Sequence, residues 1–279
     1  MAEAAFPASS ARPRRRLTLR RVFASRVVSI ALYAIIIWLI FRTARTGAEA
    51  MGYNWQWYRV PQYFLRRTEG GYELGELVTG LGASLLLSSV AFLLALIVGL
   101  AVALLRLSDL VVGKAVARVF LEIVRNMPLL VLLYVFYYVG GPIFGFDRYT
   151  ASVLCLGVFH GALVSEIFRA GINSVGRGQW EAAKSIGMTR GQSYRYIILP
   201  QSIRFMLPPL TGEAVNMIKS SAIVSVIAVA ELTTAGRNII SDTYMSFEIW
   251  FTVALVYLVV TLCLSVFVSR LEQRHAVKT

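Results

Sequence analysis

The sequence is poor in cysteine and in charged residues, and both shortages limit what the chain can be. Its 279 residues include two cysteines, and 15% are Asp, Glu, Lys or Arg. Cys155 and Cys263 lie far apart and inside apolar stretches, where we expect them to act as small hydrophobic residues. This cysteine usage predicts neither a disulfide framework nor a metal site.

The sequence also lacks the motifs of common catalytic centres. It has no G-x-x-x-x-G-K-[ST] loop to cradle the phosphates of ATP, and no H-E-x-x-H pair for a catalytic zinc. No nucleophile and base form a convincing pair. We therefore expect that the chain is not an enzyme, and that any process powered by ATP uses a separate ATPase chain.

Apolar sequence, in contrast, is in excess. Hydrophobic residues make up 57% of the chain, against roughly 45–50% in a typical soluble domain, so the composition indicates a single membrane domain. The net charge of +13 could suggest nucleic acid, but the basic residues flank apolar stretches. That distribution is typical of a topology signal, and no nucleic-acid partner is expected.

Six apolar stretches predict an all-α protein with six transmembrane helices, each near the roughly 20 residues that cross a bilayer. The first is too long for a signal-peptide core and lacks a convincing cleavage site, so we expect it to be retained. The remaining segments are a basic cytoplasmic arm, an extracytoplasmic loop whose aromatic residues favour the membrane interface, and a cytoplasmic tail. The predicted spans are 22–41, 79–105, 119–140, 151–172, 202–232 and 249–268; the arm is 1–21, the loop 42–78 and the tail 272–279.

The basic residues predict the orientation. Of the 28 Lys and Arg, 20 lie on the side of the N-terminus, 7 on the opposite side, and Lys219 within a span. Loops rich in Lys and Arg stay in the cytoplasm. Both termini and the polar stretch between the fourth and fifth spans are therefore expected there.

That polar stretch, residues 181–200, reads EAAKSIGMTRGQSYRYIILP. Good helix formers lead up to Gly187, which is typical of a left-handed helix cap. Thr189 and Gln192 have the spacing of a capping box that starts a second helix, and Pro200 is expected to end that helix. The pattern predicts two short helices that meet at an elbow.

The first helix of the elbow has little side chain at Ala182 and Ala183, so another protein could approach its backbone closely. We therefore predict that the elbow docks onto a partner. The alternative is an ordinary amphipathic surface loop.

Several charges fall within spans, where each costs roughly 2.5–3.5 kcal/mol at the helix centre. Glu122 with Arg125, and Glu166 with Arg169, are three residues apart and can pair on one helix face. We expect both pairs to lie near the cytoplasmic ends, where they neutralise each other.

The fifth span carries a polar stripe of Glu213, Asn216, Lys219 and Ser220, which fall within about a third of the helix circumference. Such a stripe must face other helices or a wet pathway. An interhelical network and a pathway lining are both open interpretations. His160, in the fourth span, is expected to pack or to hydrogen-bond to another helix rather than to contact a substrate.

The elbow resembles the EAA loop in the membrane subunits of binding-protein-dependent ABC importers. Glu181-Ala182-Ala183, Gly187 and Ile197-x-Leu199-Pro200 match that loop in residue type and spacing. Other segments within about 75–271 resemble the histidine/glutamine/glutamate/opine group of polar-amino-acid permeases. They are RNMPLLV at 125–131, EIFRAGI at 166–172, GQWEAA at 178–183, LPPL at 207–210, NMIKSSA at 216–222 and VAELT at 229–233.

This resemblance implies a type I ABC importer transmembrane domain at 79–271, with a coupling loop at 177–200. The span 22–41 is an addition to the five-helix core of that group. Glu181, Ala182, Ala183, Gly187 and Arg190 would then contact the ATPase, and the stripe Glu213, Asn216, Lys219 and Ser220 would line the translocation pathway.

The implied partners are ABC ATPase subunits, a second permease subunit (identical or paralogous), an extracytoplasmic solute-binding protein, an amino-acid substrate and the lipid bilayer. ATP and Mg would bind the ATPase, with no cofactor on this chain. The implied location is the bacterial inner membrane. One alternative is a stand-alone ion-coupled carrier or channel for small polar solutes, which would use the stripe as an ion site; a membrane enzyme is another.

Overall fold

The computed structural model describes residues 26–275. The chain divides into two units, of which the first ends at Trp55 and the second begins at Gln56. The predicted basic arm 1–21 and the first residues of the span predicted at 22–41 lie outside the described residues. The first unit contains helix α2, Arg26–Ala50. It is long enough for the hydrocarbon core, since a helix rises 1.5 Å per residue.

Helix α2 extends past residue 41, where the sequence predicted a loop from 42 onward. The Thr43 hydroxyl donates to the Leu39 carbonyl at 2.8 Å, and the Thr46 hydroxyl donates to the Arg42 carbonyl at 2.9 Å. Arg45 pairs with Glu49 at 2.8 Å one turn later. These local contacts keep a polar segment helical, so the predicted boundary at 41 is wrong.

The second unit begins with ordered structure in place of the rest of the predicted loop. A 3-10 helix η1 (Trp57–Tyr63) leads into an antiparallel hairpin of β1 (Leu65–Thr68) and β2 (Gly71–Leu74). The Glu248 carboxylate accepts a hydrogen bond from the Gln56 amide at 2.6 Å. This bond ties η1 to the start of the last helix.

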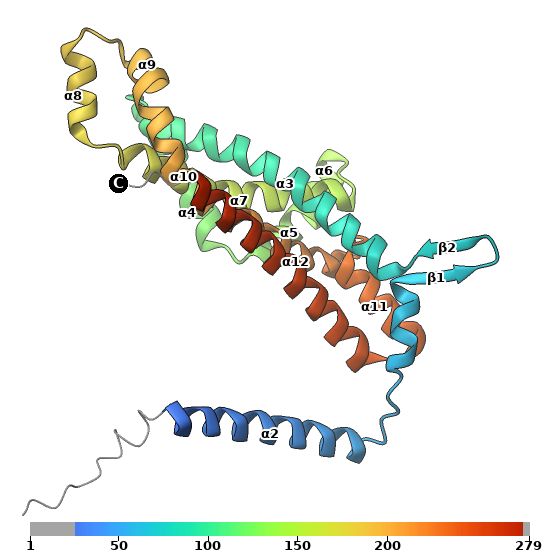
Figure 1. Cartoon of the computed structure of the whole chain (residues 1–279). Coiled ribbons are helices and arrows are strands. Elements are labelled where there is room, and N and C mark those ends of the chain that lie inside the picture. The colour runs from blue at the N-terminus through green and yellow to red at the C-terminus, as the bar shows by residue number, and fades with distance from the viewer. Residues whose placement is uncertain (1–25, 276–279) are drawn as a thin grey trace, which may run out of the picture. The chain divides into compact units, whose positions relative to one another are not determined.

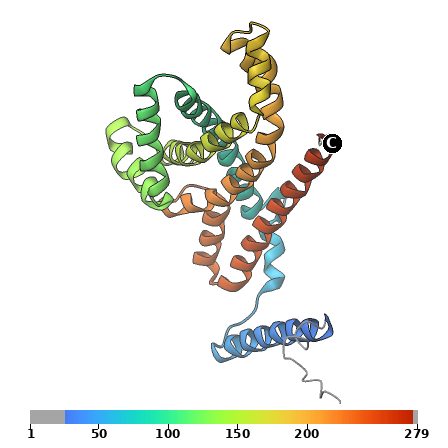
Figure 2. The same cartoon turned by 90° about the vertical axis from the view of Figure 1, so that its left-hand side faces the viewer.

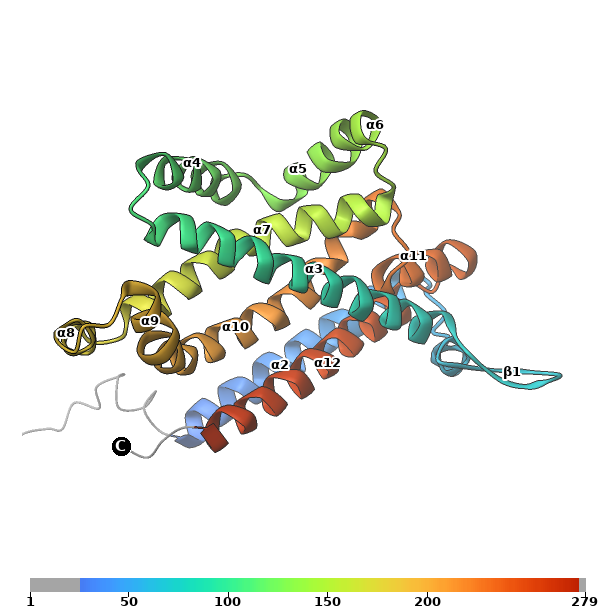
Figure 3. The same ribbon diagram turned by 90° about the horizontal axis from the view of Figure 1, so that it is seen from above.

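Helices α3 (Glu76–Leu107) and α7 (Arg148–Asn173) cross at the centre of the second unit (Figure 3). A Cβ on Gly99 would lie 2.5 Å from the Val164 side chain, and a Cβ on Gly161 would lie 2.8 Å from the Val98 side chain. Only glycine permits this close approach, which is typical of packing between membrane helices.

The region predicted as the third span bends sharply. Helix α4 (Val111–Asn126) is followed, after Pro128, by α5 (Leu129–Tyr134), a π-helical turn η2 (Val135–Gly140) and α6 (Gly141–Phe144). The bend measures 107°. Proline disfavours a helical conformation at the residue before it, so α4 ends near Met127 and the predicted 119–140 span is two segments at an angle.

After α7 the chain forms the short helices α8 (Arg177–Ser185) and α9 (Arg190–Ser193). A π-helical turn η3 (Tyr194–Ile198) then leads into α10 (Leu199–Ser221) without a break, as Figure 2 shows. The prediction that Pro200 ends the second elbow helix is therefore wrong. The wider π turn changes the hydrogen-bond pattern just before the proline, and the helix continues through Pro200.

The chain ends with a 3-10 turn η4 (Ala222–Ile227), helix α11 (Leu232–Thr243) and helix α12 (Ser246–His275). Figure 1 shows the β1–β2 hairpin and the pair α8–α9 at opposite ends of α3. Helix α12 runs back toward the α8–α9 end. Within residues 26–275, four helices are long and apolar enough to cross a membrane, or six segments if each bent pair is one span.

Candidate functional site

The polar segment between α7 and α10 forms the predicted elbow. Gly187 has φ +77°, and the Met188 amide donates to the Ala183 carbonyl at 3.1 Å while the Gly187 amide donates to the Lys184 carbonyl at 3.0 Å. This pattern is a Schellman cap. The capping box of Thr189 and Gln192 is present at the start of α9, so both local predictions are confirmed.

The predicted docking residues divide between two faces of the elbow. Glu181, Ala182 and Gly187 are exposed, whereas Ala183 is fully buried. Ala183 therefore lets α8 pack closely on its own chain, and Ala182 is the alanine that leaves an outer backbone accessible. Ile186, which the sequence reasoning missed, is 73% exposed beside Gly187. An apolar residue within a polar loop was the signal for it.

The elbow is braced from inside by aromatic packing. The rings of Trp180 on α8 and Tyr194 on η3 meet edge to face, with centroids 5.0 Å apart. The Gln201 amide donates to the Gln179 side chain at 3.2 Å. Beside these contacts lies a groove of about 600 Å³ whose lining includes Glu181, Lys184 and Arg190. The two short helices are thus fixed to one another and to α10.

Arg190 connects the elbow to the turn between α3 and α4. Its guanidinium pairs with the Asp109 carboxylate and donates to the Leu107 carbonyl at 3.0 Å. Asp109 was not singled out from the sequence, because nothing local indicates a partner 81 residues away. Arg190 therefore also acts as a link between the elbow and the ends of α3 and α4.

The residues of the polar stripe on α10 differ in their exposure. Glu213 is buried, and its carboxylate accepts a hydrogen bond from His160 Nδ1 on α7 at 2.6 Å and one from Asn216 at 3.3 Å. Asn216 and Lys219 are exposed in the single chain, and Ser220 is half-buried. The helix–helix hydrogen bond predicted for His160 is confirmed, and Glu213 belongs to an interhelical network.

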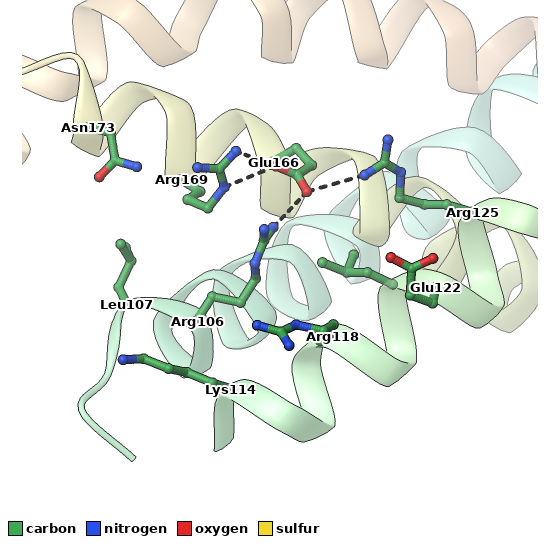
Figure 4. Close-up of a pocket in the computed structure, with 10 residues that line it drawn as sticks. Arg106, Leu107, Lys114, Arg118, Glu122, Arg125, Glu166, Arg169 and Asn173 are labelled. Carbon is green, nitrogen blue, oxygen red and sulfur yellow. Dashed lines mark hydrogen bonds and ion pairs between the residues drawn. The ribbon is translucent and has the colours of Figure 1, made fainter. Parts of the chain in front are cut away.

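Another charged cluster joins α3, α4 and α7 at the end of the bundle that carries the elbow. The Glu166 carboxylate pairs with Arg106 at 2.6 Å, Arg169 at 2.9 Å and Arg125 at 3.3 Å (Figure 4). The predicted Glu166–Arg169 pair is confirmed. The predicted Glu122–Arg125 pair is wrong, because Arg125 turns to Glu166 and the Glu122 carboxylate accepts from Asn126 instead.

The start of α7 is fixed by a charged cap. The Asp147 carboxylate accepts hydrogen bonds from the hydroxyl and amide of Thr150, and these bonds hold the pKa of Asp147 below its ordinary value. The contribution of this cap to stability is therefore present at neutral pH. It is lost as the pH falls through the lowered pKa.

The family model described as the binding-protein-dependent transport system inner membrane component matches residues 95–277. The chain belongs to this family. It is therefore a multi-pass inner-membrane transport subunit, a permease, as the motif resemblance implied. The matched segment begins within α3 and includes the elbow, the α10 stripe and α12.

Individual proteins agree with the family match. The probable glutamine ABC transporter permease protein GlnM of Bacillus subtilis (strain 168) is 38% identical over 193 residues, which cover 68% of this chain and 89% of that protein. The glutamine transport system permease protein GlnP of Escherichia coli (strain K12) is 35% identical over 201 residues, which cover 71% and 92%.

A solved structure has the same fold. The crystal structure of an amino acid ABC transporter with histidines matches with a TM-score of 0.68 and 41% sequence identity, over 71% of this chain and 94% of that chain. The second unit of this chain therefore has the type I importer fold.

Proposed function

We propose that the chain is the permease subunit of an ATP-driven importer for polar amino acids, in which a separate ATPase docks onto the α8–α9 elbow. The observation that carries this proposal is the build of the elbow itself. It presents an exposed face containing Glu181, Ala182, Ile186 and Gly187, while Ala183 and the Trp180–Tyr194 contact fix it from inside. Because the elbow is braced in this way, a movement of the docked ATPase would displace the elbow as a unit and would not deform it.

The contacts of the elbow determine which helices would move with it. Helix α9 continues through η3 into α10, so displacement of the elbow is passed directly to α10. Arg190 carries part of the same displacement to Asp109 and Leu107, between α3 and α4. ATP binding and hydrolysis in the partner would thereby move α3, α4 and α10 together.

The proposal includes an orientation and a set of partners. The elbow and both termini lie in the cytoplasm, as the Lys and Arg bias indicates, and the β1–β2 hairpin end faces the solute-binding protein. ATP and Mg bind the ATPase subunits, with no cofactor on this chain. A second permease subunit, identical or paralogous, covers the exposed Asn216 and Lys219, which with Ser220 line the pathway between the two subunits.

The polar amino acid as cargo rests on relatives named for glutamine transport and on a matching structure titled as an amino acid ABC transporter. In the reconstituted complex, the loaded binding protein should stimulate ATP hydrolysis with one or a few polar amino acids. Stimulation by sugars or metal ions alone would contradict this part of the proposal.

The docking claim is tested by Gly187→Asp with Gly187→Asn as its matched control. Both side chains tolerate the left-handed conformation that Gly187 holds, and only Asp adds a charge to the docking face. Gly187→Asp should reach the membrane at the normal level but lose ATP-dependent uptake about tenfold or more. Gly187→Asn should keep most of the uptake. Normal uptake by Gly187→Asp would contradict docking at the elbow.

A further inference from the structure

A pocket of about 450 Å³ lies between the end of α3, the length of α4 and the end of α7. It has an unusual excess of positive charge. Five basic side chains and two carboxylates line it: Arg106, Lys114, Arg118, Arg125 and Arg169, with Glu122 and Glu166. Arg125, Glu166 and Arg169 belong to segments that resemble the permease group, whereas Lys114 and Arg118 lie in none of those segments and have no part in the proposed transport mechanism.

The charges inside the pocket do not cancel. Three guanidiniums share the single carboxylate of Glu166. The side chains of Lys114 and Arg118, in contrast, form no ion pair or hydrogen bond with any residue that the structure describes, and Figure 4 draws no dashed line to either. A concave surface lined by one sign of charge concentrates ions of the other sign. Arginine forks in particular match the oxygens of phosphate.

Helix α4 adds a second feature that points to a lipid. The side chains of Val112, Val116, Val119 and Ile123 form an exposed apolar face on α4, while Lys114 and Arg118 lie on a different face of the same helix. A helix with an apolar face and a basic face is typical of the boundary between acyl chains and headgroups. Basic pockets between membrane helices bind anionic headgroups.

We propose that this pocket binds a phosphate-bearing anion, and that the phosphate comes from the headgroup of an anionic phospholipid beside α4. Leu107 and Asn173 line both this pocket and the groove beside the elbow. A bound headgroup would therefore stabilise the α3–α4 turn that Arg190 contacts. The regulatory consequence, which rests on the proposed function, is that anionic lipid raises the coupling of ATP hydrolysis to uptake.

The binding test uses the purified full chain in nanodiscs or detergent and does not depend on transport. Retention of phosphatidylglycerol is compared with that of phosphatidylcholine by native mass spectrometry. The test variant is Lys114→Gln with Arg118→Gln, which breaks no ion pair of the described chain. The matched control is Arg204→Gln with Arg270→Gln, which removes the same charge from exposed residues outside both the pocket and the elbow.

The wild type and the control should retain phosphatidylglycerol preferentially, and the pocket variant should bind it roughly tenfold more weakly, since each basic residue near a membrane surface attracts anionic lipid. Equal retention of the two lipids by the wild type, or equal loss in both variants, would overturn the proposal. Inorganic phosphate that competes fully with the lipid would support an anion site but assign it to free phosphate.

The regulatory part is tested with the reconstituted transporter in vesicles with and without phosphatidylglycerol. Uptake per ATP should rise with the anionic lipid in the wild type and the control but not in the pocket variant. An equal rise in all three would overturn the regulatory role. Absence of uptake in every lipid would count against the proposed function instead, and the binding result would stand apart from it.

Discussion

Glu213 shows how a single polar residue can serve packing inside a membrane protein. Its carboxylate lies between His160 on α7 and Asn216 on its own helix, so a group that would be costly in lipid is satisfied within the bundle. The hydrogen bond to His160 joins α7 to α10, the two helices between which the elbow is inserted.

The loss of stability on replacing Glu213 should therefore depend on whether the new side chain can accept the hydrogen bond from His160. Glu213→Leu leaves His160 Nδ1 buried without its acceptor, which costs about 1–3 kcal/mol. Glu213→Gln keeps an acceptor in place and should cost less. Thermal unfolding of the purified protein in detergent measures the difference. Equal melting temperatures for the two variants would show that the His160 contact contributes nothing.

Arg190 is predicted to act through its two contacts with the α3–α4 turn. Its pair with Asp109 is exposed, and exposed pairs contribute roughly 0–1 kcal/mol, so neither Arg190→Ala nor Asp109→Ala should unfold the chain. Both should lower ATP-driven uptake, with Arg190→Ala lower because it also loses the Leu107 carbonyl. In the double variant, Asp109→Ala should add nothing to Arg190→Ala. Fully additive losses would show that the two residues act separately.

At the scale of elements, the crossing of α3 and α7 sets the geometry of the bundle. Gly161→Leu would drive a side chain into Val98, since even a Cβ would lie 2.8 Å from it, and overpacking of this kind costs about 1–3 kcal/mol. Gly82→Leu is a matched control on α3, because nothing lies within 4 Å of its Cβ position. Gly161→Leu should lower the melting temperature and membrane yield, whereas Gly82→Leu should leave both near the wild-type values.

The elements also show which features could be predicted from the sequence. The cap at Gly187 and the capping box at Thr189 depend on residues within one turn, so local patterns were sufficient to predict them. Pro200 misled the prediction, because a π turn immediately before it allows the helix to continue. The β1–β2 hairpin was missed because its strands are short and largely exposed, with no apolar alternation to indicate them.

Contacts between distant parts of the chain could not be predicted in the same way. The partner of Glu213 lies 53 residues away, and the partner of Arg190 lies 81 residues away. Glu122 and Arg125 have the right spacing to pair, yet Arg125 finds Glu166 once α4 packs beside α7. The sequence predicts which side chains need partners in a membrane, and the packing of helices decides which partners they obtain.

At the scale of the whole second unit, the hairpin and the elbow lie at opposite ends of α3 (Figure 1). A transport subunit needs such a division, because the solute arrives on one side of the membrane and ATP is available on the other. In the proposed orientation, every contact that links the elbow to α3, α4 and α10 lies at the cytoplasmic end.

The most direct measurement is cysteine labelling and cross-linking at Ser185, an exposed residue on α8. The background carries Cys155→Ala and Cys263→Ser, and Tyr72→Cys on the exposed hairpin serves as the reference for the other side. In intact cells an impermeant maleimide should label Tyr72→Cys but not Ser185→Cys, and in opened membranes Ser185→Cys should cross-link to the ATPase chain. Labelling of Ser185→Cys from outside, or no cross-link to the ATPase in an active transporter, would contradict the account.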